Sequence, residues 1–309
     1  MPISLPPRLA GWRRAELLTG DASARRYSRL WNGDDRTAIL VEYPLAVRSQ
    51  LQHDLEVLSW CRGLGLKVPD LLLGDLETGW ALLGDLGSAD AEFTLEITPA
   101  GERRSIFERM LEPLEVLARC GPEDLPPWNP PLDRSRLRWE LAGFELWFVR
   151  HFRSKTPSTG LARWLDDLAT VVGNHPVRVC HRDYHLNNLL IQPDDRVGVI
   201  DIQDILLGPD TYDVVSLVAE RAATRLISPS ERRSVLASWA DRTNAEPGWR
   251  ERAAAVRIQR GLKVLGTFAR FTLEGRTDYR RWLTELARDL AAPLGRIGAP
   301  PDITAFLLD

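Results

Sequence analysis

The first quarter of the chain carries short apolar runs, whereas most of the rest has apolar residues at helical spacing. Apolar runs at 17–30, 36–43, 68–74 and 80–83 predict strands, because they are brief and bounded by turn-forming residues. The first of these runs holds two strands joined by a loop of small residues. One helix is predicted at 48–62, where leucines recur every three or four positions and two glycines follow. The predicted order is strand, strand, strand, helix, strand, strand.

Beyond residue 87 the pattern becomes mainly helical. Helices are predicted at 102–119, 137–152, 161–172 and 249–290, and a proline-rich segment at 121–133 reads as a surface loop. The chain is long enough for two substantial cores. We therefore expect an α+β fold with a small sheet lobe over residues 1–86, a hinge at about 83–87 and a larger, mostly helical lobe over 87–309.

A polar loop and a hairpin interrupt the helical part between residues 177 and 217. A short apolar strand leads into the loop HRDYHLNN, and a tight hairpin follows that ends at Asp201. Because strands hold their terminal residues rigidly, Asp183, Asn188 and Asp201 should converge at one end of this hairpin. Phosphoryl transfer needs such a set: one carboxylate for the proton of the attacking hydroxyl, and an amide and a second carboxylate for magnesium.

Several neighbours of these three residues are candidates for supporting roles. His181 is expected to hold the loop, and Asp213 either braces the loop through backbone N–H groups or caps the next helix. His185 is expected on the side of the loop that faces the phosphate acceptor, which makes it a candidate for contact with the substrate or the phosphate. Gln203 and Asp204 follow the predicted metal ligand, where they would contact a second metal or the acceptor, with a simple turn cap as the alternative for Asp204.

The small-residue loop near the N-terminus is a candidate cover for nucleotide phosphates. Small residues let backbone N–H groups approach a phosphate closely, although a plain hairpin turn explains the loop equally well. The predicted phosphate-binding residues are Gly20, Asp21, Ala22, Ser23 and Arg26. At the hinge, the predicted adenine contacts are Leu83, Asp85 and Leu86, with a simple interlobe linker as a compatible reading.

One expected residue is missing. Protein kinases carry on their third strand a lysine that pairs with the phosphates and with a helix acid, and that position here is Val41. Asp54 or Glu56 would be the helix acid. Three explanations stay open: Arg25 supplies the phosphate charge, Arg26 does so, or the site relies on metal and backbone alone.

Composition excludes several other classes of protein. Of 309 residues, 44% are hydrophobic and 27% charged, and the net charge of −3 argues against a coat for nucleic acids. Three cysteines form no CxxC pair, and no apolar stretch is long enough to span a membrane. No signal peptide is visible, so a cytoplasmic location is expected. Residues 250–290 hold ten Arg or Lys against five Asp or Glu, which favours a neutral or anionic acceptor over a polycation.

The motifs HRDYHLNNLL and VIDIQD resemble the aminoglycoside phosphotransferase and kinase-like superfamily. GDASARRYSRL, GPDTYDVVSL and QRGLKVLGTFAR together resemble the bacterial anomeric kinases of N-acetylmuramic acid and N-acetylglucosamine, over about residues 17–270. The resemblance implies a protein-kinase-like two-lobe fold, ATP and Mg²⁺ as co-substrate and cofactor, and phosphorylation of the sugar's C1 hydroxyl during cell-wall sugar recycling. By motif, Asp183 is the base and Asn188 and Asp201 are the metal ligands.

The resemblance does not fix the residues that bind the sugar. The candidates are His185, Gln203, Asp204, Glu145 and Arg260, with Trp147 and His151 as further walls of a sugar-sized pocket in a helix whose aromatic residues also suit core packing. Two other readings stay open. One is a kinase of the same fold that acts on an unacetylated amino sugar, an aminoglycoside or an amino alcohol; the other is a pseudokinase regulator.

Overall fold

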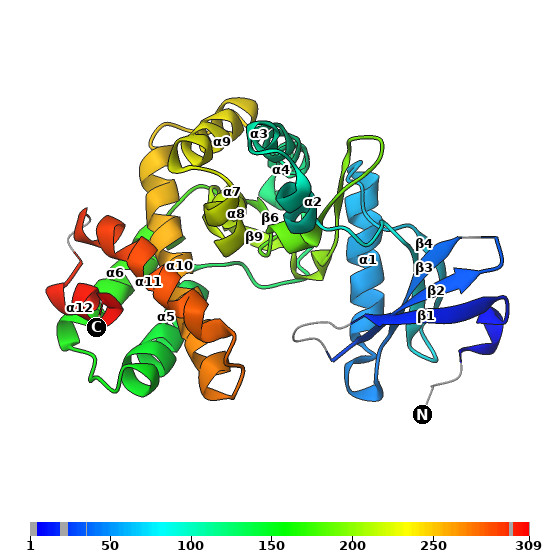
Figure 1. Ribbon diagram of the computed structural model, residues 1–309, viewed down its shortest axis with the longest axis horizontal. Coiled ribbons are helices and arrows are strands. Elements are labelled where there is room, and N and C mark those ends of the chain that lie inside the picture. Colours follow the sequence, from blue (N-terminus) through cyan, green and yellow to red (C-terminus); the bar gives the residue numbers. More distant parts are fainter. Residues whose placement is uncertain (1–4, 19–23, 35, 297–298, 309) are drawn as a thin grey trace. The chain divides into compact units, whose positions relative to one another are not determined.

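A five-stranded antiparallel sheet forms the centre of the first part of the chain in the computed structural model, which describes residues 5–18, 24–34, 36–296 and 299–308. The strand order is β1-β2-β3-β5-β4, with β1 at Trp12–Leu18, β2 at Arg26–Asn32, β3 at Thr37–Glu42, β4 at Leu71–Asp75 and β5 at Trp80–Gly84. Helix α1 (Gln50–Gly63) lies alongside this sheet (Figure 1).

Residues of β3 alternate between the two faces of the sheet, as expected of a strand. Val41 packs with Leu51 of α1, whereas Leu40 packs on the opposite face with Leu9 of the short 3₁₀ helix at Pro7–Leu9. This alternation fixes which side chains of the sheet face α1.

The hairpin of β7 (Leu189–Ile191) and β8 (Val197–Val199) belongs to the same unit as the sheet. The Val199 N–H donates to the Lys67 carbonyl at 2.8 Å, and Gln192 Nε2 donates to the Leu86 carbonyl at 2.9 Å. Unit 1 therefore comprises Met1–Thr94 with Asn187–Gln203, and unit 2 comprises Leu95–Leu186 with Asp204–Asp309. The sequence placed the boundary at about residue 86 and the whole hairpin in the second lobe, because it could not reveal these backbone bonds.

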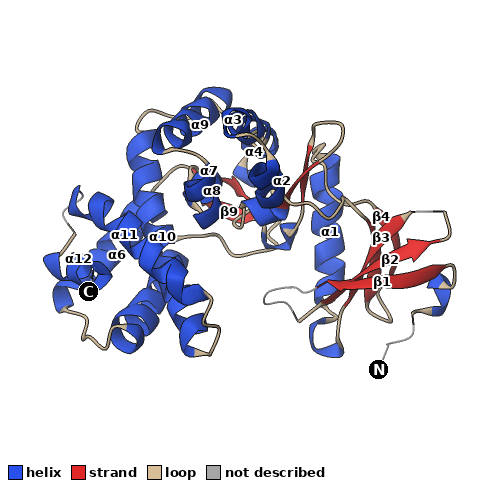
Figure 2. Cartoon of the chain, viewed as in Figure 1, coloured by secondary structure: helices blue, strands red, loops and turns tan. Residues whose placement is uncertain are grey.

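Unit 2 is mainly helical, as Figure 2 shows by colour. Its strands β6 (Val177–Cys180) and β9 (Leu206–Pro209) pair antiparallel. Its helices, beginning with α2 at the unit boundary, are α2 Ala91–Ile97, α3 Ala100–Arg109, α4 Glu112–Ala118, α5 Arg134–Gly143, α6 Thr159–Gly173, α7 Tyr212–Ala219, α8 Arg221–Leu226, α9 Pro229–Arg242, α10 Trp249–Leu273, α11 Tyr279–Arg296 and α12 Pro301–Leu308. A sheet with one main helix and a helical second unit were both predicted.

Three helices predicted as continuous are divided in the structure. The chain breaks after α3 at Met110, turns between α10 and α11 at Gly275, whose φ is 96°, and passes from α5 into a π-helix at Phe144–Phe152. The spacing of the apolar residues did not reveal these breaks.

A close approach of two backbones joins α5 to α10. A Cβ atom on Gly266 of α10 would lie 2.5 Å from the Gly143 carbonyl carbon and 2.6 Å from the Phe144 nitrogen. Only glycine allows this contact. The approach brings Glu140 of α5 against Gln259 and Lys263 of α10.

Candidate active site

The loop that carries Asp183 follows β6 in unit 2 and is held at several points. Asp213, in the first turn of α7, accepts the backbone N–H of His181 at 2.6 Å and that of Arg182 at 2.9 Å. Tyr184 is fully buried, donates its hydroxyl to the Met110 carbonyl at 2.6 Å and meets the His181 ring edge-on. The loop is therefore fixed by hydrogen bonds on both sides of Asp183.

Arg182, the residue before Asp183, has a left-handed backbone with φ of 78°. Such a conformation costs a non-glycine residue about 1–3 kcal/mol. Asp213 holds its N–H, and Arg260 donates from NH1 to its carbonyl at 3.2 Å. Arg260 in turn lies 4.5 Å from the centre of the Tyr212 ring. The strained peptide is thus clamped at both ends.

Cations surround Asp183. Burial works against its charge, but Lys263, Arg260 and Arg182 more than offset that effect and lower the pKa of the carboxyl. An opposite charge nearby favours the ionised form of an acid. Asp183 is therefore an ionised carboxylate at neutral pH, as a group that accepts a hydroxyl proton must be.

Glu140 is the buried partner of these cations. Its side chain is 2% exposed, and its Oε1 lies 3.3 Å from Lys263 Nζ and 3.8 Å from Arg182 NH2, while Oε2 accepts from Gln259 Nε2 at 3.0 Å. Arg182 NH1 also lies 3.5 Å from Asp204 Oδ1. Neither Glu140 nor Lys263 was among the predicted site residues. The sequence did carry one signal for them: Glu140 and Gln259 are polar residues on helix faces that are otherwise apolar.

Asn188 and Asp201 lie at one end of the β7–β8 hairpin in unit 1. The Ile200 N–H donates to the Asn188 carbonyl at 3.0 Å, which keeps the two ends of the hairpin together. Asp201 has a φ of 62°, and its Oδ1 accepts from Gln203 Nε2 at 2.8 Å. The structure thus brings the two predicted metal ligands to one place, and Asp183 belongs to the other unit.

This pair suits Mg²⁺ by donor chemistry. Magnesium takes oxygen ligands and usually keeps several waters, with one or two carboxylates and the substrate's phosphates completing its shell. Among the described residues no group of three His, Cys, Asp or Glu forms a complete protein cage for a metal. One carboxylate and one amide oxygen are consistent with a metal that arrives with its nucleotide.

Arg25 and Asp54 form an ion pair near this hairpin end within unit 1. Arg25 NH1 lies 2.7 Å from Asp54 Oδ2, and Arg25 NH2 lies 3.9 Å from Asp201 Oδ1. The Tyr43 hydroxyl donates to the same Asp54 oxygen at 2.7 Å. Val41 is 2% exposed in the apolar layer between β3 and α1. Of the two helix acids considered, Asp54 pairs with Arg25, and Glu56 accepts a hydrogen bond from Gln52.

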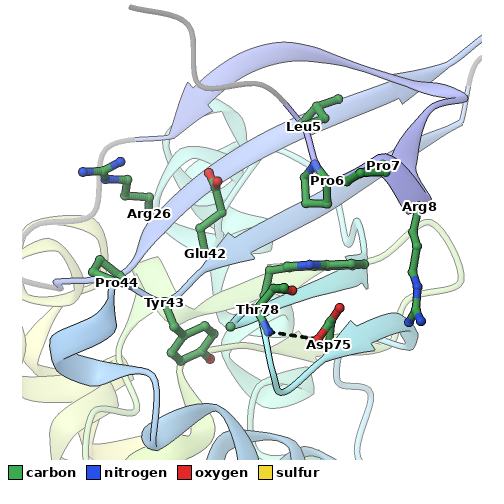
Figure 3. Close-up of a pocket in the computed structure, with 12 residues that line it drawn as sticks. Leu5, Pro6, Pro7, Arg8, Arg26, Glu42, Tyr43, Pro44, Asp75 and Thr78 are labelled. Carbon is green, nitrogen blue, oxygen red and sulfur yellow. Dashed lines mark hydrogen bonds between the residues drawn. The ribbon is translucent and has the colours of Figure 1, made fainter.

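Arg26 lies elsewhere, on an open pocket of about 650 Å³ in unit 1. Figure 3 shows it with Glu42, its partner on β3, and with Tyr43 and Pro44 on the pocket wall. The pocket contains none of the residues predicted for metal binding or proton transfer. Gly20, Asp21, Ala22 and Ser23 lie outside the described residues.

The hinge residues make contacts inside unit 1. Arg29 Nε donates to Asp85 Oδ2 at 2.7 Å, and the Gly87 N–H donates to Asp85 Oδ1 at 2.9 Å. Burial works against the charge of Asp85, but these two donors lower the pKa of its carboxyl. The Leu86 carbonyl accepts from Gln192, and Leu83 packs on the α1 side of the sheet. The Asp85 side chain therefore stabilises the hinge by its own hydrogen bonds. Contacts to adenine are then predicted from the backbone groups of the hinge.

The candidate sugar-binding residues divide between the units. Gln203 belongs to unit 1, where His53 Nε2 lies 3.0 Å from its carbonyl oxygen. In unit 2, Glu145 pairs with Arg138 at 2.8 Å, and His185, half-buried, donates its backbone N–H to the Asp183 carbonyl at 3.0 Å. Arg260 is half-buried and donates to the Arg182 carbonyl of the loop, which makes it a loop-holding residue in this structure. Asp204 pairs with Arg182.

Comparison with known proteins places the chain among phosphotransferases. The model of the phosphotransferase enzyme family matches residues 14–255. A relative from Pseudomonas aeruginosa named N-acetylmuramate/N-acetylglucosamine kinase is 33% identical, over 84% of this chain and 79% of its own length. Two solved structures share the fold: an aminoglycoside-3'-phosphotransferase of type VIII (TM-score 0.60, 18% identity, 83% of this chain and 96% of that one), and the choline kinase LicA from Streptococcus pneumoniae (TM-score 0.61, 15% identity, 91% and 95%).

These matches identify the fold as the protein-kinase-like fold of aminoglycoside phosphotransferases and choline kinases, which confirms the predicted fold class. No helix among the described residues is both long and apolar enough to cross a membrane.

Proposed function

The chain belongs to the phosphotransferase enzyme family, and from that premise we propose that it transfers the γ-phosphoryl group of ATP to the C1 hydroxyl of N-acetylmuramic acid, N-acetylglucosamine or both. The product is the α-1-phosphate, formed in cytoplasmic recycling of cell-wall sugars. The clamped, ionised Asp183 carries the proposed chemistry. The proposed acceptor is supported by the name of the Pseudomonas aeruginosa relative.

In the proposed mechanism Asp183 orients the anomeric hydroxyl and accepts its proton as the oxygen attacks the phosphorus atom in line. Its clamped peptide supplies the positioning that such a reaction depends on. Asn188 and Asp201 would hold Mg²⁺, which neutralises charge on the nucleotide phosphates when it is bound. The cations around Asp183 keep it ionised before the sugar arrives.

The test is to incubate the purified protein with ATP, Mg²⁺ and each sugar, and to follow products by ³¹P NMR. We expect a sugar phosphate that is hydrolysed in mild acid, as an anomeric phosphate is. No product with either amino sugar overturns the acceptor, and a product stable to acid overturns the C1 position. Turnover by itself rules out a pseudokinase. Asp183→Ala serves as the inactive control.

Other acceptors are tested by competition, since likeness of fold does not select an acceptor. Glucosamine, an aminoglycoside and choline are each added in excess over N-acetylglucosamine. Arg182, Arg260 and Lys263 gather at Asp183, and three cations beside the base disfavour a polycationic acceptor. We therefore expect the aminoglycoside to inhibit least, and preferential phosphorylation of any of the three would replace the proposed acceptor.

A further inference from the structure

We propose that Arg25 binds the nucleotide phosphates in place of the missing third-strand lysine, and that Asp54 of α1 holds Arg25 in position. The proposal rests on the kinase function above and assigns a residue to it. It concerns unit 1 alone, in which Arg25, Asp54 and Asp201 all lie.

Position 41 lacks the positive charge that protein kinases carry on the third strand. Val41 lies in an apolar layer against α1, so β3 offers no cation there. Arg25 stands just before β2, half-buried, and its guanidinium meets α1 through Asp54 at 2.7 Å. Arg25 therefore supplies a cation that is held by an acid of the main helix, as the kinase lysine is, but it stands just before β2 and not on β3. Arginine also suits phosphate better than lysine does, because its planar fork of N–H donors matches phosphate oxygens.

The guanidinium of Arg25 lies between Asp54 and Asp201. While NH1 contacts Asp54, NH2 lies 3.9 Å from Asp201 Oδ1. Asp201 is a predicted magnesium ligand, and magnesium at such a site is shared with the nucleotide phosphates. A cation beside Asp201 therefore stands beside the place where those phosphates must come.

Asp54 is itself held in place by a second residue, Tyr43. The Tyr43 hydroxyl donates to Asp54 Oδ2 at 2.7 Å, and Arg25 lies 6.0 Å from the centre of the Tyr43 ring. Burial raises the pKa of the Asp54 carboxyl, and the bonds from Tyr43 and Arg25 oppose that rise. Tyrosine and arginine therefore fix the acid from two sides, which leaves the guanidinium little freedom to turn.

The neighbouring arginine is not equivalent. Arg26 opens β2 and is exposed, and it shares the pocket of Figure 3 with Glu42. Arg25 forms an ion pair with Asp54 of α1, whereas the described residues show no ion pair between Arg26 and that acid.

Calorimetric titration with ATP, ADP and AMP in the presence of Mg²⁺ tests the assignment. Loss of a charge-assisted bond to a phosphate lowers affinity by roughly one to two orders of magnitude. Arg25→Ala should therefore weaken ATP about 10- to 100-fold and leave AMP within about threefold, with ADP between them. Arg25→Lys should recover part of the ATP affinity. Arg62→Ala, which removes an exposed arginine paired with Asp70 in the same unit, is the matched control and should bind all three nucleotides normally.

Three results would overturn the proposal. Equal weakening of ATP and AMP would make Arg25 a structural residue only. An unchanged ATP affinity would remove it from the site. A phosphate-dependent loss in Arg26→Ala without one in Arg25→Ala would transfer the role to Arg26. If Arg25→Ala does not fold by circular dichroism, Arg25→Gln takes its place in the series. Failure of the wild-type protein to bind ATP would instead overturn the kinase function.

Discussion

Asp213→Asn isolates the contribution of the loop clamp. The carboxylate accepts two backbone N–H groups, from His181 at 2.6 Å and from Arg182 at 2.9 Å. An asparagine in the same position keeps one acceptor oxygen and turns an NH₂ donor toward the other N–H. The substitution therefore removes one hydrogen bond and weakens the second, with almost no change in volume.

The expected loss of stability follows from two opposing free energies, the hydrogen bonds to Asp213 and the backbone strain at Arg182. Each hydrogen bond to a charged acceptor contributes about 1.5–3 kcal/mol, and a neutral one about 0.5–1.5 kcal/mol. The left-handed peptide of Arg182, with φ of 78°, stores about 1–3 kcal/mol. In wild type the free energy of the two hydrogen bonds exceeds the cost of the backbone strain. In Asp213→Asn the free energy of the single neutral hydrogen bond is comparable to that cost or smaller. We expect a loss of about 2–4 kcal/mol in the free energy of unfolding.

The loss should also reach the reaction, because Arg182 precedes Asp183. A relaxed peptide moves the base away from its position, so kcat should fall about 10- to 100-fold, since a factor of ten corresponds to about 1.4 kcal/mol. KM for ATP should change little. Asp210→Asn is the matched control: Asp210 is another buried acid three residues earlier, and it pairs with Arg252 at 2.7 Å and not with the loop.

Urea unfolding and steady-state kinetics on both variants decide the matter. The control should lose stability and keep kcat. If Asp213→Asn also keeps kcat within about threefold while it loses stability, the clamp stabilises the fold and does not position the base. If both variants lose kcat alike, the loss comes from general destabilisation of unit 2, and Asp213 has no specific role in positioning Asp183.

Three further predictions concern unit 2. Asp183→Ala should lower kcat about a thousandfold with ATP affinity nearly unchanged, and an active variant would remove Asp183 as the base. Lys263→Met removes the cation that most lowers the pKa of Asp183, so that pKa rises and the acid limb of the kcat/KM profile should move to higher pH; an unmoved limb would contradict the assignment. Gly266→Ala forces the α5 and α10 backbones apart and should cost about 1–3 kcal/mol in urea unfolding, whereas Gly143→Ala, whose Cβ would meet nothing within 4 Å, should cost none.

The reaction was predictable from the sequence because its signals are local. Asp183, Asn188 and Asp201 follow one another along one loop and one hairpin, and the sequence predicts that they converge at one end of the hairpin. The hairpin of β7 and β8 indeed holds Asn188 and Asp201 together. The order of strands around α1 followed from the period of the apolar residues in the same way.

The partners of these residues were not predictable, since they come from distant parts of the chain. Glu140 and Lys263 are separated by more than a hundred positions, and they meet only because Gly266 lets two helices approach closely. The choice between Arg25 and Arg26 depended on where β2 begins. It also depended on which of them meets Asp54 of α1, a contact between residues 29 positions apart that the sequence does not reveal.

One residue in each unit, next to or among the predicted site residues, has a strained backbone conformation. Arg182, beside the base, and Asp201, a predicted metal ligand, both have positive φ, at 78° and 62°. Neither is a glycine, and each is held by side chains: Arg182 by Asp213 and Arg260, and Asp201 through Gln203. A glycine would adopt either conformation at no cost, but it would supply neither the guanidinium that meets Glu140 nor the carboxylate. The strain at both positions is therefore the consequence of needing a charged side chain at a sharp turn, and the surrounding hydrogen bonds are what allow it to persist.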